Sequence, residues 1–370
     1  MDDRAKAGYN EPWNDLYGYI IGNLTYAENN KIVNTFKIGS ENYDEKNIGN
    51  WNDGEDYQAN QYNKYTLYIS TKALQKNKPN IILFIHGKGQ TKENMQHLSS
   101  RYAKMGFITA ILDFTDPTAN HPENVKASIY RALDEVTMCL NHIKNYLINK
   151  YEFEEKKMEL AIGGFSLGGI LTLSYGNFLR DKSPIPIKFL ISIAGGVSSE
   201  PEYWYRINDN GEPYDTIDYE TVKKGIEDKY LVPVFKPIAQ LQNMNGHAGN
   251  KFTSEQISKM IINNNIDKTN ADYKEMVKII SPSFAINHID KNTVPIIAIQ
   301  GGLDTGAGLA HVANLMKKME EQNIFDRLKF VYMKYGDHPL MDYKTENGKQ
   351  AMRDMHSSNL DYAEKYFSKE

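Results

Sequence analysis

From about residue 79 onward, short apolar runs alternate with segments in which apolar residues recur every three or four positions. Between two of these runs, the apolar residues from Ile129 to Leu147 recur at steps of four and three, which predicts one face of a long helix. Continuous apolar runs of five or six residues are typical of a parallel sheet that is covered on both faces. We therefore predict an α/β fold with a mostly parallel central sheet and helices on both faces. Its strands are expected at residues 81–85, 108–113, 159–163, 189–194, 295–300 and 328–333.

Two parts of the chain depart from this alternation. Residues 1–78 are polar and rich in Asn, Tyr and Asp, with strand-like stretches at 35–38 and 65–69 that we interpret as antiparallel edge strands. Residues 197–280 have the pattern of mixed helices and loops, and the segment is long enough to form a lid. We therefore expect an N-terminal extension over 1–78 and one domain over 79–370, with an insertion at 197–280.

Composition narrows the class of protein without naming a function. With 24% charged and 41% hydrophobic residues, the 370-residue chain is too balanced for a disordered protein. A formal net charge of -4 provides no positive field that would attract nucleic acid, so no nucleic-acid partner is expected. The single cysteine, Cys139, excludes an internal disulfide, and its position on the predicted helix indicates a small core residue.

Membrane and targeting signals are absent from the pattern. The longest apolar runs are far shorter than the ~18 residues that a membrane-spanning helix needs, so we expect no integral membrane segment. The first residues lack a charged stretch followed by an apolar one. As given, the sequence favours a cytoplasmic protein, and the alternative is an exported protein whose leader has been removed.

One motif joins a predicted strand to a predicted helix. Residues 164–168 read Gly-Phe-Ser-Leu-Gly, directly after the strand at 159–163. In a sharp strand-to-helix turn, a serine is exposed at the carboxyl end of the sheet, and only small residues fit two positions before and after it. Ser166 is therefore the candidate nucleophile, although G-x-S-x-G by itself is also compatible with an ordinary glycine-rich turn.

A serine nucleophile requires a base and usually a carboxylate that orients it. His338 follows the last predicted strand and Asp304 follows the one before it, so both leave the same edge of the sheet as Ser166. We predict His338 as the base and Asp304 as the acid. Asp337 is the alternative acid, and Asp113, which follows the apolar residues 108–112, and Asp290 are further candidates.

An oxyanion formed during acyl transfer needs backbone donors. The strand at 81–85 is followed by His86-Gly87-Lys88-Gly89-Gln90, a glycine-containing loop that can turn an N–H inward. We expect the backbone N–H groups of Lys88 and Leu167 to be the two donors, with Gly89 or Gln90 as alternatives to Lys88. His86 itself is interpreted as a structural histidine.

Together these residues resemble the α/β-hydrolase family, and within it the serine esterases and lipases. The resemblance covers about residues 79–196 and 281–370, with four motifs in order, each after its strand. It implies that Ser166, Asp304 and His338 are nucleophile, acid and base, and that the His86-Gly87 turn belongs to an oxyanion hole. It also implies that the insertion at 197–280 lies where lids of the family lie.

The predicted function is that of a serine hydrolase that cleaves a carboxylic ester through an acyl-enzyme intermediate, with a small-molecule ester or other acyl compound as substrate. A peptidase, acyltransferase or thioesterase with the same triad is an alternative. A non-catalytic binding module on a hydrolase scaffold is another, because fold does not dictate function. No cofactor or metal motif is present, since no His-Glu-x-x-His spacing occurs. Oligomeric state and acyl preference stay open.

Overall fold

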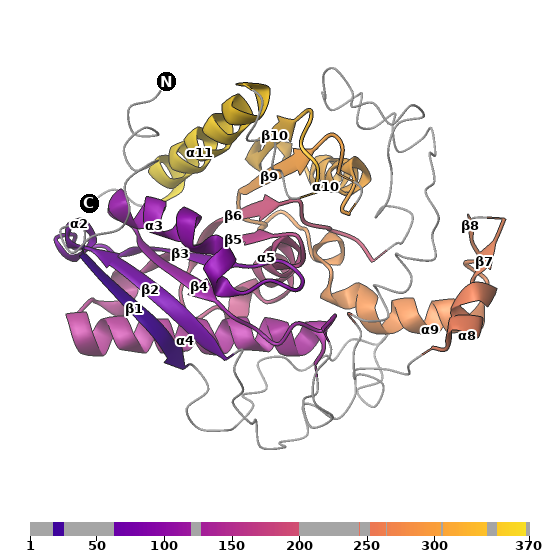
Figure 1. Ribbon diagram of the computed structural model, residues 1–370, viewed down its shortest axis with the longest axis horizontal. Helices are drawn as coiled ribbons and strands as arrows, with labels where there is room; N and C mark the ends of the chain where they lie inside the picture. The colour runs from indigo at the N-terminus through magenta and orange to yellow at the C-terminus, as the bar shows by residue number, and fades with distance from the viewer. Residues whose placement is uncertain are drawn as a thin grey trace.

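Eight strands pair edge to edge in one mixed sheet, in the order β1-β2-β4-β3-β5-β6-β9-β10 (Figure 1). The computed structural model describes residues 18–25, 63–119, 127–199, 252–263, 265–304, 306–338 and 346–367, together with Met244. The strands of this sheet are β1 (Gly18–Thr25), β2 (Lys64–Ser70), β3 (Asn80–Ile85), β4 (Ile108–Leu112), β5 (Glu159–Phe165), β6 (Ile187–Ile193), β9 (Ile296–Gly301) and β10 (Leu328–Met333). β1 and β2 are antiparallel to their neighbours, and the other strands are parallel.

This sheet confirms the predicted fold class. Each of the six strands expected from apolar runs is present, with ends that shift by at most two residues. The stretch at 65–69 forms β2, an antiparallel strand near one edge of the same sheet, and β1 pairs outside it. The second stretch expected as a strand, at 35–38, lies outside the described residues. The division into an extension and a domain stays a prediction.

Helices cover both faces of the sheet, as predicted. The α-helices are α2 (Thr71–Leu74), α3 (Gln96–Lys104), α4 (Ile129–Tyr151), α5 (Leu167–Phe178), α8 (Ser254–Lys259), α9 (Ala271–Ile280), α10 (Leu309–Glu321) and α11 (Glu346–Tyr366). Short 3-10 helices are η3 (Lys92–Met95), η4 (Glu155–Lys157), η5 (Arg180–Lys182), η7 (Ser281–Ser283), η8 (Ala285–Asn287) and η9 (Phe325–Arg327). No helix in the described ranges is both long and apolar enough to cross a membrane.

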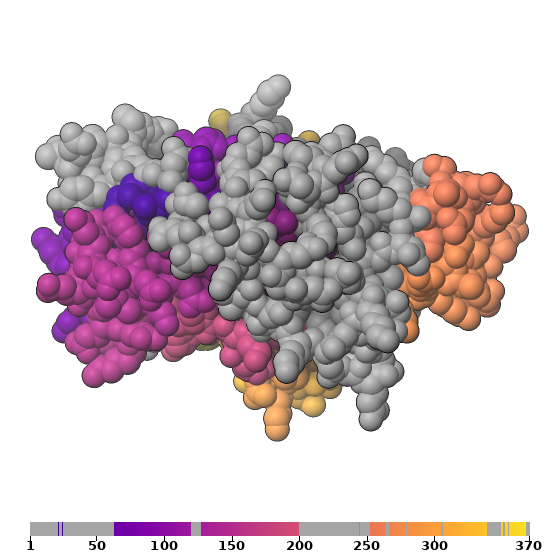
Figure 2. Space-filling view, turned by 90° about the horizontal axis from the view of Figure 1, so that it is seen from below, coloured from indigo at the N-terminus to yellow at the C-terminus, as the bar shows by residue number. Residues whose placement is uncertain are grey.

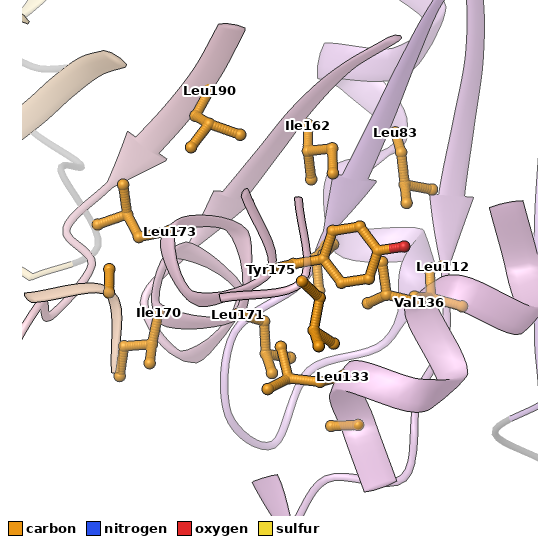
Figure 3. Close-up of a cluster of buried hydrophobic side chains, with 14 of the residues drawn as sticks. Leu83, Leu112, Leu133, Val136, Ile162, Ile170, Leu171, Leu173, Tyr175 and Leu190 are labelled. Atoms are coloured by element: carbon orange, nitrogen blue, oxygen red, sulfur yellow. The ribbon is translucent and has the colours of Figure 1, made fainter. Parts of the chain in front are cut away.

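The largest apolar cluster lies between the sheet and helices α4, α5 and α10 (Figure 3). Alternate residues of the central strands, such as Leu83 and Ile162, contribute to it because successive side chains of a strand point to opposite faces. The intervening residues, such as Ile82 and Phe84, pack with α3 and α11 on the other face. Burial on both faces explains why these strands consist of continuous apolar runs.

Helix α4 matches the predicted 129–147 helix and extends it to Tyr151. It begins where the Ser128 hydroxyl accepts a hydrogen bond from the Arg131 N–H, and it ends at Glu152 in a left-handed conformation. Cys139 on this helix is fully buried in the main cluster, and burial raises the pKa of its thiol well above the usual value. Cys139 is therefore a core residue, as predicted, and its thiol is not activated.

Part of the predicted insertion forms a projection at one end of the molecule. Helix α8 leads into a two-stranded hairpin of β7 (Ile261–Ile262) and β8 (Asn265–Ile266), which α9 follows. These elements, in orange, lie at the end away from α4 in both views (Figures 1 and 2). The hairpin adds to the helices and loops expected there. Residues 200–243 are outside the described ranges, so the lid stays a prediction.

The N-terminus of α5 approaches the end of β3 closely. A Cβ atom on Gly168 would lie 2.1 Å from the carbonyl oxygen of Ile85 and 2.5 Å from that of His86. Neither carbonyl can move freely, because both belong to the backbone at the end of a central strand. Only glycine fits here, and this contact sets the distance between the G-x-S-x-G turn and the loop after β3.

A chain of hydrogen bonds joins α3 to α11 on the opposite face. The Asn359 side-chain N–H donates to the Tyr102 hydroxyl (2.8 Å), and that hydroxyl lies 3.1 Å from Nδ1 of His356. Because the hydroxyl oxygen is already an acceptor, its proton is available for an unprotonated Nδ1. Burial, together with the charges of Arg101 and His97, lowers the pKa of His356 to about 3. The docking of α11 therefore depends on a neutral imidazole.

Replacing Gly168 tests the close approach of α5 to β3. We expect Gly168→Ala to lower the free energy of unfolding by about 1–3 kcal/mol, because the added methyl group overlaps backbone atoms. The matched control is Ser174→Ala in the same helix, since the buried Ser174 hydroxyl has no hydrogen-bond partner among the described residues. Urea titration measures both variants, and equal stabilities would contradict the close contact.

Acid should weaken the protein through His356. In the unfolded chain a histidine gains its proton near pH ~6.5, whereas folded His356 stays neutral down to about pH 3. The unfolded state binds more protons between these values, so this contribution to stability is complete above about pH 6.5 and is lost as the pH falls. His356→Gln should therefore reduce the pH dependence of the unfolding free energy by about 1 kcal/mol per pH unit between pH 6 and 4.

Tyr102→Phe is the control for this measurement, because it removes the two hydrogen bonds of the hydroxyl but keeps the titrating imidazole. It should lower stability by a similar amount at each pH. An unchanged slope in His356→Gln would show that His356 does not contribute to acid sensitivity.

Candidate active site

Ser166 occupies the sharp turn between β5 and α5. Its backbone has φ 53° and ψ -115°, a conformation that side-chain-bearing residues rarely adopt. Hydrogen bonds hold the turn on both sides: the Ser166 N–H donates to the Ile193 carbonyl (2.8 Å), and the Ser166 carbonyl accepts from the Ile170 N–H (3.0 Å). This strained geometry matches the strand-to-helix turn expected from the G-x-S-x-G motif.

The His338 imidazole lies against the serine hydroxyl, on the loop that follows β10. Its Nε2 is 2.7 Å from Ser166 Oγ, within hydrogen-bond distance. The side chain is 29% exposed, so the ring remains open to solvent on one side. On its inner side the ring of Phe165 packs at a centroid distance of 5.4 Å. The residues that the sequence analysis paired as nucleophile and base are thus in contact.

Asp304 lies on the far side of the imidazole. Its carboxylate is fully buried, with Oδ1 at 2.9 Å and Oδ2 at 3.0 Å from His338 Nδ1. A neutral imidazole that donates its Nδ1 proton to this carboxylate has an unprotonated Nε2, which can accept the Ser166 proton. Hydroxyl, imidazole and carboxylate therefore form a continuous hydrogen-bonded chain in the order that proton transfer requires.

Backbone hydrogen bonds tie together the two loops that contain Asp304 and His338. The Gly302 N–H donates to the Met333 carbonyl and the Leu303 N–H to the Gly336 carbonyl, each at 2.9 Å. These bonds continue the pairing of β9 and β10 beyond the ends of the strands. The separation between acid and base is consequently determined by the sheet.

The structure also describes the three other carboxylates that were considered as the acid. Asp337 is exposed, and Asp304 contacts the His338 ring instead. Asp113 accepts from the Lys92 N–H (2.6 Å) and pairs with its ammonium group (3.2 Å). Asp290 pairs with Arg180 at 3.3 Å.

His86 is buried beside the loop after β3 and takes no part in the chain of Ser166 and His338. Its Nδ1 lies 2.8 Å from the Gly87 carbonyl oxygen, and its ring stacks on Phe114 with a centroid distance of 4.6 Å. This agrees with the structural role expected from the sequence. Within the described ranges, no group of three His, Cys, Asp or Glu side chains is arranged to hold a metal ion.

Residues 87–90 form a tight turn that presents one backbone N–H. The Gln90 N–H closes the turn on the Gly87 carbonyl (3.2 Å), and Gly89 has a φ of +65°. The Gly87 N–H donates to the Gln90 side chain (3.0 Å) and the Gly89 N–H to Asp116 (2.8 Å). Of the four amides, that of Lys88 alone has no acceptor among the described residues.

This turn packs against the nucleophile turn. A Cβ atom on Gly87 would lie 2.8 Å from the Phe165 ring. Leu167 is the first residue of α5, where a helix leaves its backbone N–H groups without intrahelical acceptors. The positive end of the α5 dipole lies at the same place and favours negative charge there.

Three residues of this region were not singled out by the sequence analysis. Asp116 holds the Gly89 amide, Phe165 packs on the base, and the Gln300 side chain donates to Asp304 Oδ2 (2.6 Å). A signal for Gln300 was available, since it is the only polar residue of the otherwise apolar run 295–300. Asp116 and Phe165 depend on loop packing and gave no comparable signal.

Comparison with solved structures identifies the fold. A truncated carbohydrate esterase from gut microbiota aligns with 94% of this chain and 98% of its own, at 16% identity and a TM-score of 0.53. An esterase of the archaeon Pyrobaculum calidifontis aligns over 97% of this chain and 88% of its own, at 14% identity and a TM-score of 0.51. A bifunctional GH43-CE protein of Bacteroides eggerthii aligns over 94% of this chain but only 36% of its own, at 14% identity and a TM-score of 0.51.

No protein-family model and no curated protein sequence matches the chain. At identities of 14–16%, the likeness to these solved structures concerns the arrangement of the backbone. That arrangement includes the mixed, mostly parallel sheet with helices on both faces described above. The protein therefore has the α/β-hydrolase fold.

Proposed function

We propose that the protein is a serine hydrolase that cleaves carboxylic esters through an acyl-enzyme intermediate. The observation that carries this proposal is the hydrogen-bonded chain from Ser166 Oγ to His338 Nε2 (2.7 Å) and from His338 Nδ1 to Asp304 (2.9 Å). A non-catalytic binding module would need neither this alignment nor the strained backbone of Ser166, whose conformation costs stability.

In the proposed reaction, Ser166 Oγ attacks the ester carbonyl while His338 Nε2 accepts the hydroxyl proton. Asp304 stabilises the imidazolium that forms and keeps the ring in the required tautomer. The same proton is then donated to the leaving alcohol, which departs and leaves an acyl group on Ser166. Water, deprotonated by His338, attacks this ester and releases the carboxylic acid.

The backbone N–H groups of Lys88 and Leu167 are proposed as donors to the oxyanion. Support comes from the free Lys88 amide at the tip of its turn and from the position of Leu167 at the N-terminus of α5. Donors of this type act on charge that develops only during the reaction, so they stabilise the transition state more than the substrate. Gly89 and Gln90, the alternatives to Lys88, already donate to other acceptors.

A carbohydrate esterase among the structures of similar fold makes an acylated sugar a reasonable member of the substrate panel. The panel should compare p-nitrophenyl acetate and butyrate, an acetylated monosaccharide, a thioester and a peptide, each with and without an amine acceptor. Preferential turnover of the oxygen esters supports the proposed class. Preferential peptide cleavage, thioester cleavage or transfer to the amine would instead favour the alternative reactions of the same triad.

Removing the nucleophile should abolish activity. We expect Ser166→Ala to reduce kcat on p-nitrophenyl esters by at least about 10³-fold, because the hydroxyl forms the covalent bond. Wild-type protein should also be labelled on Ser166 by a fluorophosphonate, as mass spectrometry of the tryptic peptide would show. Ser174→Ala, which removes a buried hydroxyl from the same helix, is the matched control and should retain activity. Labelling at a different residue, or none, would refute the proposal.

The Lys88 amide can be removed without changing the turn. Residues 87–90 have a left-handed residue in the third position only, as in a type II turn, and proline is favoured in the second position of such a turn. Lys88→Pro deletes the N–H, and we expect it to lower kcat by about 10²- to 10³-fold.

Lys88→Ala keeps the N–H and removes the exposed side chain, so it should retain wild-type kcat within about threefold. Steady-state kinetics on p-nitrophenyl butyrate compares the two variants, and circular dichroism checks their folding. Equal activity of Lys88→Pro and Lys88→Ala would show that the Lys88 N–H does not belong to the oxyanion hole.

A further inference from the structure

Gln300 is a buried polar residue near the carboxyl end of the otherwise apolar strand β9. Its side chain is in the sheet core with 1% of the residue exposed. The side-chain N–H group donates to Asp304 Oδ2 (2.6 Å) and to the Ala307 carbonyl (2.5 Å). It therefore spans the turn that contains the carboxylate and contacts both of its ends.

The carboxylate of Asp304 is surrounded by donors from this turn. Its Oδ1 accepts the N–H groups of Gly306 (2.7 Å) and Ala307 (2.9 Å) in addition to His338 Nδ1. Its Oδ2 accepts from the Gln300 amide. Burial of a carboxylate is unfavourable unless its oxygens accept hydrogen bonds, and these donors meet that need. Gln300 restrains the oxygen that the backbone amides do not hold.

The amide oxygen of Gln300 argues against a purely structural role for this side chain. Gln300 Oε1 is buried and has no hydrogen-bond partner among the described residues. An unpaired buried acceptor destabilises the folded state, and an apolar side chain at this position would avoid that cost. The N–H group, which donates to Asp304, is therefore the part of this side chain that explains its presence in the core.

We infer that Gln300 is a positioning residue that orients the Asp304 carboxylate toward His338. The inference rests on the proposed triad and deepens it, because it assigns the alignment of the acid to a side chain in the sheet core. Gln300 touches neither the base nor the nucleophile in this role. It acts through Asp304, and the readouts must therefore report on the chemistry of the triad.

Gln300→Met is the first test, since methionine has nearly the shape of glutamine and lacks the donor. We expect kcat on p-nitrophenyl butyrate to fall about 10- to 100-fold with KM changed less than threefold, because misplacement of a catalytic group affects the chemical step. Asn177→Leu is the matched control: Asn177 is also a buried amide with two hydrogen bonds, to the Leu173 carbonyl and the Thr293 hydroxyl, distant from the triad. Its kcat per folded molecule should stay within twofold of wild type.

Gln300→Glu is the second test and gives a distinct pH signature. At lower pH the introduced carboxyl group and Asp304 share one proton, which replaces the hydrogen bond to Asp304 but not the one to the Ala307 carbonyl. As the pH rises this proton is lost, and repulsion between two buried carboxylates displaces Asp304. We expect an alkaline decline in kcat between pH 7 and 10 that wild-type protein lacks. This variant is isosteric, so it also decides the question if Gln300→Met fails to fold.

Three other titratable side chains are relevant to the pH profiles of these variants. His338 faces Asp304 from the β10 loop, and exposed Asp337 is its neighbour in sequence. His311 of α10 is buried, and burial lowers its pKa to about 3, so it stays neutral throughout the range tested.

Three outcomes would overturn the inference: a Gln300→Met kcat within twofold of wild type, an equal loss in Asn177→Leu, or a Gln300→Glu profile parallel to that of wild type. Failure of the proposed function looks different. In that case wild-type protein itself neither hydrolyses the ester nor is labelled by the fluorophosphonate, and the role of Gln300 is refuted with it. Active, labelled wild type with unaffected variants refutes the role of Gln300 alone.

Discussion

Six strands of the sheet run parallel, so their carboxyl ends lie along one edge. The Ser166 turn, the Lys88 turn, Asp304 and His338 are separated by up to 250 residues in the chain, yet each follows the end of one of these strands. The sheet is buried on both faces, and its strands cannot slide without exposing apolar side chains. The alignment of the candidate site thus depends on the register of the core.

Close backbone contacts convert this arrangement into a defined geometry. Gly168 lets α5 begin against the carbonyl groups of Ile85 and His86, and this brings the serine turn next to the loop after β3. On the other side, backbone bonds between the Gly302 and Met333 segments join the acid and base loops. Neither contact involves a side chain that takes part in the proposed reaction. The strain at Ser166 is therefore sustained by the surrounding backbone.

Two sets of buried polar side chains are stabilised by hydrogen bonds from different parts of the chain. Asp304 is fully buried, and its charge is compatible with burial because backbone amides, His338 and Gln300 donate to it. On the opposite face of the sheet, the Tyr102 hydroxyl forms hydrogen bonds with His356 and Asn359 and so connects α3 to α11. There the buried group is a neutral imidazole. At His356 burial lowers the pKa to about 3, and this couples the packing of α11 to pH.

The amino-acid sequence determined the fold class, the six central strands and helix α4, because apolar periodicity is a local record of which faces are buried. It also singled out Ser166, Asp304 and His338, since each follows a predicted strand and parallel strands share an edge. What only the tertiary structure decided is the hydrogen-bonded contact among these three residues, and the Lys88 amide that has no acceptor among the described residues. Gln300 stands out in the sequence as a polar residue in an apolar run, but its hydrogen bond to Asp304 is seen only in the tertiary structure. Such features depend on atoms from distant segments that meet within hydrogen-bond distance, and no local pattern encodes that separation.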